Sequence, residues 1–297
     1  MTSGQAHLRA RRAAGISTLA LLTTGFAPAA RAGIQYFDAF RTGDFQQTTA
    51  NPAFTPADAS FWFFTARVFQ SAAGDVGSAS VTDPGPGSPL NLAPNGNVFA
   101  GGGTFGSLAD LDAAFPGGTY DYSITGGTLG SDTGSLTLPA THLYVQSVPA
   151  FANFNSIQTA VDPAQPFTFQ WNSLVANPAA DQSLVFFSVY DATSFATVVD
   201  SGGLAAATTS FQIPAASLLP DHQYTADVFF SSRQNSGTGF ANTSEPPGGI
   251  TGLVGDDYVT AVTFTTVPEP AAGGFAAAGL LTGFGLWRRA RRRAPAR

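Results

Sequence analysis

Hydrophobic and polar residues alternate with a period of two over most of the chain between residues 33 and 267. Phe167, Phe169 and Trp171 fall on one face of such a stretch, and the run 61–69 is apolar on both faces. The first pattern is typical of a half-buried strand and the second of a central strand buried on both sides. Clusters of Gly, Pro, Asn and Asp separate the runs, so an all-β body is predicted.

Two of the predicted strands open with a tyrosine that follows a proline by four residues. The pairs are Pro116 with Tyr120 and Pro220 with Tyr224. The second copy resembles the tyrosine corner of fibronectin type III and immunoglobulin-like domains, where the Tyr hydroxyl turns back to the preceding loop. This resemblance implies a sandwich of two antiparallel sheets around each corner.

Further strands can be placed around Tyr224. They are expected at 143–148, 167–171, 184–190, 196–199, 209–213 and 258–265. In the first half, Ser107 is expected to cap a short helix that continues through Leu111 to Phe115, with Asp110 at its third position. The fold class predicted is therefore all-β, with two tandem immunoglobulin- or fibronectin-like antiparallel sandwiches at 33–140 and 141–267. A single larger sandwich or jelly roll is the alternative.

The first 32 residues have the pattern of a signal peptide. A basic segment that ends at Arg12 is followed by an apolar stretch, and Ala30-Arg-Ala32 is an A-x-A cleavage site. The mature chain is expected to begin at Gly33 after cleavage by signal peptidase on the Sec export route. A retained membrane anchor is the alternative.

Residues 268–297 have a second processing pattern. Pro268, Glu269 and Pro270 precede an uncharged stretch from Ala271 to Trp287. At about 1.5 Å per residue this stretch, as a helix, just spans a bilayer core. It ends in a basic cluster of Arg288, Arg289, Arg291, Arg292 and Arg293. The positive-inside rule places this membrane stop in the cytoplasm, so the body lies on the other side.

This order of a Pro-Glu-Pro tripeptide, a short apolar span and terminal arginines resembles the PEP-CTERM sorting signal of Gram-negative bacteria. The resemblance covers only 268–297. It implies an exosortase-like processing protease as partner, a membrane-anchored intermediate in the inner membrane, and final delivery to the cell surface or extracellular matrix. It also implies an association with exopolysaccharide. An ordinary tail anchor, with Pro-Glu-Pro as a rigid linker, is the alternative.

The net charge of residues 33–267 limits the classes of molecule that the body can bind. The chain has no lysine, and between residues 33 and 267 only Arg41, Arg67 and Arg233 oppose 18 acidic residues, a net charge of −15. Such a body repels phosphate backbones, so nucleic-acid binding is excluded. The chain has no cysteine, which excludes disulfides and thiolate metal sites.

No set of residues predicts an active site, a metal site or a cofactor. Asp132-Thr-Gly and Asp200-Ser-Gly resemble the paired loops of aspartic proteases, but they lie too close in sequence for two lobes. No nucleophile elbow accompanies His142 or His222, and the latter is expected to be a solvated loop histidine.

The remaining polar and aromatic candidates are also interpreted as structural. The acidic pairs 110/112 and 256/257 lack the spacing of a calcium loop and are expected in solvated turns. Trp62 and Trp171 are expected in the core rather than on a sugar-stacking platform. The expected function is a non-enzymatic structural or interaction role in the cell envelope. A carbohydrate-binding module is the alternative, followed by a secreted hydrolase.

Overall fold

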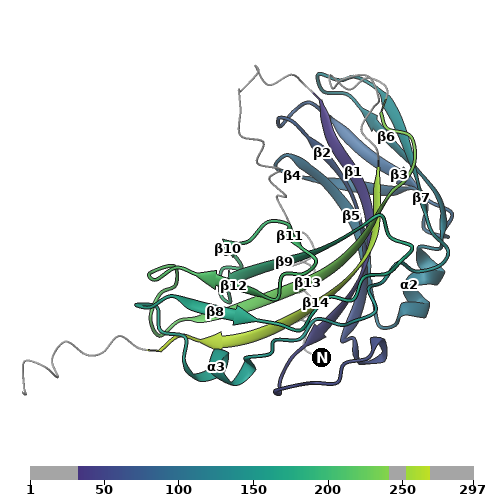
Figure 1. The fold of residues 1–297 in the computed structure, drawn as a ribbon. Coiled ribbons are helices and arrows are strands. Elements are labelled where there is room, and N and C mark those ends of the chain that lie inside the picture. Colours follow the sequence, from purple (N-terminus) through teal and green to yellow (C-terminus); the bar gives the residue numbers. More distant parts are fainter. Residues whose placement is uncertain (1–32, 241–251, 268–297) are drawn as a thin grey trace, which may run out of the picture.

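The structure of the protein is a computed structural model, and it describes residues 33–240 and 252–267. Nearly all regular structure in these residues is β, as the period-two pattern predicts, and most of it lies in one curved sheet (Figure 1). The strand order is β10-β9-β13-β14-β1-β2-β5-β4-β3-β6-β7. A second sheet pairs β12 with β8, and β11 adds to β9. The all-β fold class is therefore confirmed.

The helices and strands follow one another closely along the chain. They are β1 (Ile34–Gln46), a 3-10 turn (Pro56–Asp58), β2 (Phe61–Gln70), β3 (Ser78–Thr82), β4 (Leu90–Asn95), β5 (Val98–Phe105), α2 (Leu108–Ala114), β6 (Gly118–Thr125), β7 (Asp132–Leu138), α3 (Phe154–Thr159), β8 (Phe167–Gln170), β9 (Gln182–Asp191), β10 (Thr197–Asp200), β11 (Leu204–Ala205), β12 (Ser210–Ile213), β13 (Gln223–Asn235) and β14 (Leu253–Thr265).

The first and last strands lie side by side in the middle of the large sheet. β1 pairs in parallel with β14 and antiparallel with β2, while β14 pairs antiparallel with β13. Strands from the two ends of the chain therefore form one surface, and the sheet runs across the predicted boundary at residues 140/141 without interruption. The prediction of two separate sandwiches did not include this pairing. The division into domains at 140/141 stays a prediction.

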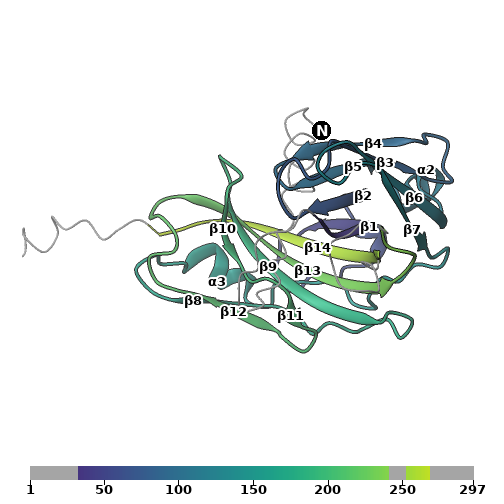
Figure 2. The same ribbon diagram turned by 90° about the horizontal axis from the view of Figure 1, so that it is seen from above.

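Two hydrophobic cores lie along the sheet. In Figure 1 and Figure 2, the end of the large sheet that contains β3, β6 and β7 curves back over β1, β2 and β5, while β8, β12 and α3 lie against the other part of the sheet. The first core is built mainly from residues before 140 and the second mainly from residues after it. The exceptions are Phe45, Trp62 and Leu111, which belong to the second core, and Phe240 and Val254, which belong to the first. Long strands therefore serve both cores.

The predicted helix cap and most of the predicted strands are confirmed. Ser107 caps α2 by accepting a hydrogen bond from the Asp110 N–H, as predicted. The expected strands near 167–171, 184–190, 196–199, 209–213 and 258–265 are confirmed as β8, β9, β10, β12 and β14.

The strand expected at 143–148 is wrong, because the segment forms no β-ladder. Its polar backbone groups bind side chains and loops instead. The Leu143 N–H donates to Asp256, and the Tyr144 carbonyl accepts from Asn177 Nδ2 at 3.1 Å. The segment crosses the inner face of the sheet as an irregular strap, and its residues Tyr144 and Val145 belong to the second core.

Candidate functional site

The motifs Asp132-Thr-Gly and Asp200-Ser-Gly, which resemble the loops of aspartic proteases, lie at opposite edges of the large sheet. Asp132 opens β7 and Asp200 ends β10, the two outermost strands in the sheet order. Each carboxylate accepts a hydrogen bond from a backbone N–H in its own turn, that of Thr133 at 2.8 Å and that of Gly202 at 2.9 Å. The pair does not converge, so the shared-proton chemistry of aspartic proteases has no basis in this fold.

Both histidines of the body are paired with aspartates. His222 Nε2 lies 2.5 Å from Asp191 Oδ2, and its side chain is 31% exposed, so the predicted loop histidine is partly solvated and is paired with an aspartate. Hydrogen bonds from the Ser194 N–H and from His222 hold the pKa of Asp191 well below its usual range. His142 contacts Asp112 on α2 at 3.1 Å. These pairs fasten loops to neighbouring elements, and no cluster that could hold a metal ion occurs among residues 33–240 and 252–267.

The expectation that Asp256 and Asp257 lie in a solvated turn is also wrong, because both are part of β14. Asp256 is fully buried and accepts two hydrogen bonds from Arg41, from Nε at 2.7 Å and from Nη2 at 3.0 Å. Arg41 is itself 1% exposed, and it also donates to the Pro139 carbonyl at 3.3 Å. The sequence feature that could have indicated this pair is Arg41 itself, because the body contains only three arginines.

The other two arginines of the body form a cation–aromatic row on the opposite face of the sheet. The Arg233 guanidinium lies 4.7 Å from the Phe186 ring centre and 5.3 Å from that of Phe40. Arg67 lies 5.7 Å from Phe40 and donates two hydrogen bonds to Asp38, at 2.9 Å and 2.8 Å. Sequence reasoning missed this row because its members come from four different strands.

The two tyrosine corners have different hydrogen bonds. The Tyr120 hydroxyl donates to the Pro116 carbonyl at 2.8 Å, and the Tyr224 hydroxyl accepts from the Leu219 N–H at 2.8 Å. Each hydroxyl thus turns back to the loop before its own strand. Both rings are at most 2% exposed, so the corners fix loop geometry and present no chemistry to solvent.

Trp62 and Trp171 are buried, as expected. Trp62 is 4% exposed and Trp171 is 3% exposed, and the Trp171 indole N–H donates to the Thr208 carbonyl at 2.9 Å. Neither ring can therefore stack on a ligand, which removes the tryptophan platform as a sugar site.

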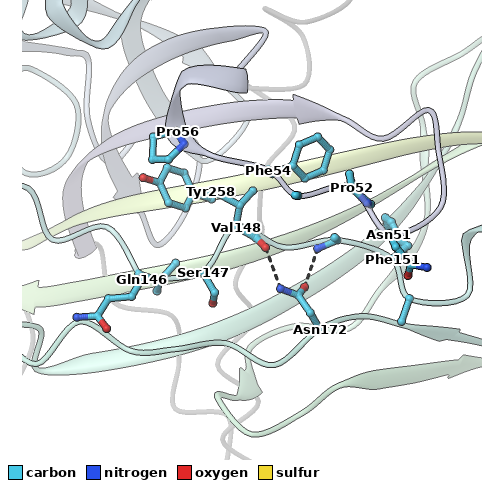
Figure 3. Close-up of a pocket in the computed structure, with 14 residues that line it drawn as sticks. Asn51, Pro52, Phe54, Pro56, Gln146, Ser147, Val148, Phe151, Asn172 and Tyr258 are labelled. Carbon is cyan, nitrogen blue, oxygen red and sulfur yellow. Dashed lines mark hydrogen bonds between the residues drawn. The ribbon is translucent and has the colours of Figure 1, made fainter.

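A cavity of about 540 Å³ lies between the loop after β1 and the strap that crosses the sheet (Figure 3). We call it the strap groove. Its walls include Asn51, Pro52, Phe54 and Pro56 from the loop, Gln146 and Val148 from the strap, and Phe151, Asn172 and Tyr258. None of its 14 lining residues is charged. Its size falls in the range of pockets for small ligands.

The two walls of the groove are fixed by two carboxamides. Gln47, which is 2% exposed, accepts from the Phe151 N–H at 2.7 Å and donates to the Phe151 carbonyl at 3.0 Å. Asn172 likewise accepts from the Ala150 N–H and donates to the Val148 carbonyl (Figure 3). The groove is therefore preformed.

Two further carboxamides in the groove wall are exposed. The side chains of Asn51 and Gln146 make no hydrogen bond to any residue that the structure describes, so their donors and acceptors face solvent. Beneath them, burial raises the pKa of Tyr258 to about 12, with Asp256 acting in the same direction. Tyr258 therefore stays protonated at neutral pH. The groove offers neutral hydrogen-bonding groups above an aromatic surface.

The residues predicted for export and sorting lie largely outside the described residues. These are Ala30 and Ala32 of the cleavage site, Pro268, Glu269 and Pro270, and the arginines of the membrane stop. Gly33 is the first residue that the structure describes. Among the described residues, no helix has the length and apolar character needed to span a membrane.

Comparisons with known proteins give only distant likenesses. No protein-family model matches the chain, and no curated protein matches it. Among solved structures, the chain is similar to the BSP domain of a biofilm associated protein, with 13% identity, a TM-score of 0.21, and coverage of 80% of this chain and 30% of that one. The FN1–FN3 domains of chicken CNTN1 give 10% identity, a TM-score of 0.25, and coverage of 65% and 62%. Domains A168–A170 of titin give 12% identity, a TM-score of 0.22, and coverage of 74% and 66%.

The chain thus spans less than two thirds of the first two of these structures. At such low TM-scores the likenesses carry no argument about function. The fold class follows from the strands and their pairing.

Proposed function

We propose that this chain is a non-enzymatic β-sandwich protein of the cell envelope, exported with cleavage after Ala32 and sorted through its C-terminal tail. The observation that carries this proposal is the order of Pro268-Glu-Pro270, an uncharged stretch and an arginine cluster. The two processing patterns agree on one topology, with the body outside the cytoplasm.

The body supports a structural or interaction role. Its candidate acids Asp132 and Asp200 are held at opposite sheet edges, and its histidines are engaged in loop-fastening pairs. An exosortase-like protease, signal peptidase and the Sec machinery are the processing partners in this account, and the membrane holds the intermediate. Exopolysaccharide is the surrounding matrix of the delivered protein.

The sorting claim can be tested by replacing Pro268, Glu269 and Pro270 with alanine. Full-length protein is then expected to accumulate in the membrane fraction, because the processing protease no longer recognises the tail. The chain offers a matched control in Glu245-Pro-Pro247, another triplet of one Glu and two Pro, whose replacement should leave processing intact. Unchanged processing of the 268–270 variant would count against the sorting assignment.

A second candidate function is the binding of neutral saccharide in the strap groove. The specific observation is a preformed groove without charged residues, with two exposed carboxamides next to Phe54 and prolines. Carboxamides match the donor and acceptor pattern of sugar hydroxyls, and aromatic and proline rings match the apolar face of a pyranose.

Calorimetry with cellotetraose and maltotetraose tests this function on the full chain, in a detergent without a sugar head group. The combined change Asn51→Gly and Gln146→Ala is expected to weaken binding about tenfold, because two hydrogen bonds are lost. Glycine is chosen because Asn51 has a φ of 51°. Gln165→Ala, an exposed carboxamide outside the groove, is the control. Equal affinity of the groove variant and the wild type would exclude this function.

A further inference from the structure

Gly33 is fixed in place on both sides of its α-carbon. Its backbone N–H donates to Asp75 Oδ2 at 3.2 Å, and its carbonyl accepts from the Ser71 N–H at 2.8 Å. The next residue, Ile34, is already the first residue of β1 and is 1% exposed. The nitrogen of Gly33 therefore has a defined and buried position, and β1 of the central sheet begins at the next residue.

Asp75 is a buried carboxylate in the turn between β2 and β3. It is 5% exposed, and its Oδ2 accepts a second hydrogen bond from the Ala72 N–H at 2.9 Å. Its Oδ1 accepts from the Thr128 hydroxyl at 3.0 Å, and its backbone carbonyl accepts from the Leu129 N–H at 3.0 Å. These contacts orient the carboxylate toward Gly33 from two separate turns.

Within the described residues, Asp75 has hydrogen-bond donors but no cationic partner. Arg41 is bound to Asp256, Arg67 to Asp38, and Arg233 lies between aromatic rings on the far face of the sheet. The chain contains no lysine that could take this role. A buried negative charge without a positive partner is costly, and a cation beside the carboxylate would offset that cost.

We propose that Asp75 is a receptor for the α-ammonium group of Gly33, so that removal of the leader completes the fold. The proposal rests on the proposed function for the position of the cleavage. Hydrolysis of the Ala32–Gly33 peptide bond consumes one water and leaves a carboxylate on Ala32 and an amine on Gly33. The amine takes up a proton at neutral pH, because an α-amino group has a pKa of about 7.7–8.0.

Cleavage therefore changes the group that faces Asp75 from a neutral amide N–H to a cation. Both groups donate a hydrogen bond to the carboxylate, but only the cation adds a Coulomb attraction, which solvent screens less at a buried site than at the surface. The geometry exists before the charge does, so little ordering is needed when the cation forms. The mature protein is thus more stable than the same body with any residue still attached to the nitrogen of Gly33.

The absence of lysine makes this testable by simple chemistry. In protein recovered after export, the amino terminus is the sole primary amine, so amine-directed reagents modify that one group. Acetylation of the unfolded chain removes its charge, whereas reductive dimethylation adds a similar bulk and keeps the charge. After refolding, the acetylated protein is expected to melt about 3–8 °C below the dimethylated protein.

The variant Asp75→Asn completes the comparison. Its side chain keeps an oxygen for Thr128 but has no charge, so its acetylated and dimethylated forms are expected to melt together. In the folded wild type, acetylation of the amine is expected to be at least tenfold slower than in this variant. The acetylation rate thus tests the contact even if Asp75→Asn lowers the melting temperature of the protein for other reasons.

Three results would overturn the proposal. The acetylated and dimethylated wild type could melt within 1 °C of each other, the difference could persist in Asp75→Asn, or the amine could react equally fast in both folded proteins. Sequencing of the amino terminus separates this inference from its premise. A protein that begins elsewhere than Gly33 contradicts the cleavage site itself, whereas a Gly33 terminus with equal melting contradicts only the role of Asp75.

Discussion

Asp256 and Asp257 are adjacent on β14, but their side chains point to opposite faces of the sheet and have different partners. On the inner face, Asp256 and Arg41 are direct neighbours across the parallel β1–β14 ladder and share two hydrogen bonds. On the outer face, Asp257 lies opposite Ser231, and its Oδ1 is buried without a hydrogen bond from the described residues. Burial raises the pKa of Asp257 to about 6.

The difference shows that the geometry of the partner determines what a buried acid does for the fold. A planar guanidinium in register with a carboxylate satisfies both oxygens, as it does for Asp256. Arg233 attracts Asp257 only at a distance and donates to the Ser231 hydroxyl at 3.0 Å. We therefore expect Asp256 to be required for the folded state and ionised Asp257 to oppose it.

The largest effect is expected for Asp256→Ala. This change leaves Arg41 charged and buried and removes the acceptor of the Leu143 N–H, so stability should fall by about 3–5 kcal/mol. Chemical denaturation of the variant measures the loss. Asp200→Ala, at an exposed turn, is the matched control and should cost less than about 1 kcal/mol. A loss below 1 kcal/mol for Asp256→Ala would remove the central role of this pair.

A smaller effect of opposite sign is expected for Asp257→Asn. Because the pKa of Asp257 is raised in the folded state, the folded chain binds this proton more tightly than the unfolded chain. The wild type therefore gains stability as the pH falls from about 6 to about 4 and has lost this contribution above pH 6. The variant should be more stable than the wild type by up to about 2 kcal/mol at pH 7.5.

This gain should vanish below about pH 3, where the aspartate is protonated in both the folded and the unfolded state. Denaturant titrations of the two proteins at several pH values measure this difference in the free energy of unfolding directly. The contributions of the other acidic residues are the same in both proteins and cancel in the difference. A pH-independent difference would show that Asp257 does not titrate in this window.

The smallest effect is expected for Arg67→Lys on the outer face. Lysine keeps the charge but loses one of two hydrogen bonds to Asp38 and the planar contact with Phe69 at 5.2 Å. The expected loss is about 0.5–1.5 kcal/mol by chemical denaturation, because Arg67 is 14% exposed and keeps part of its hydration. An unchanged midpoint would mean that charge alone, without geometry, accounts for this pair.

The sequence predicted most strands because their period-two pattern is local. β8, β9, β10, β12 and β14 lie close to their expected positions, and Ser107 caps its helix as expected. The pattern does not say which strands pair over long distances. The parallel ladder between β1 and β14 joins the two ends of the chain, and no local signal marks it. The strap at 143–148 has strand-like alternation, but its hydrogen bonds go to Asp256 and Asn177.

The candidate sites were less predictable for the same reason. The strap groove needs Asn51, Gln146 and Tyr258, which lie far apart in sequence and are brought together by the strap and the central sheet. The buried acid at position 256 could not be told from a solvated turn, because an Asp-Asp pair is common in both settings and its partner Arg41 is remote. The acids at 132 and 200 resembled a site only as short motifs, and the sheet order separates them.

The central claim is that this body is delivered outside the cytoplasm and is processed at both ends. Intact-mass analysis of the protein recovered from the producing cells, with sequencing of both termini, tests it most directly. The account predicts an exported chain that begins at Gly33 and lacks the arginine cluster from Arg288 onward. Recovery of the uncut 297-residue chain from the soluble cytosolic fraction would contradict it.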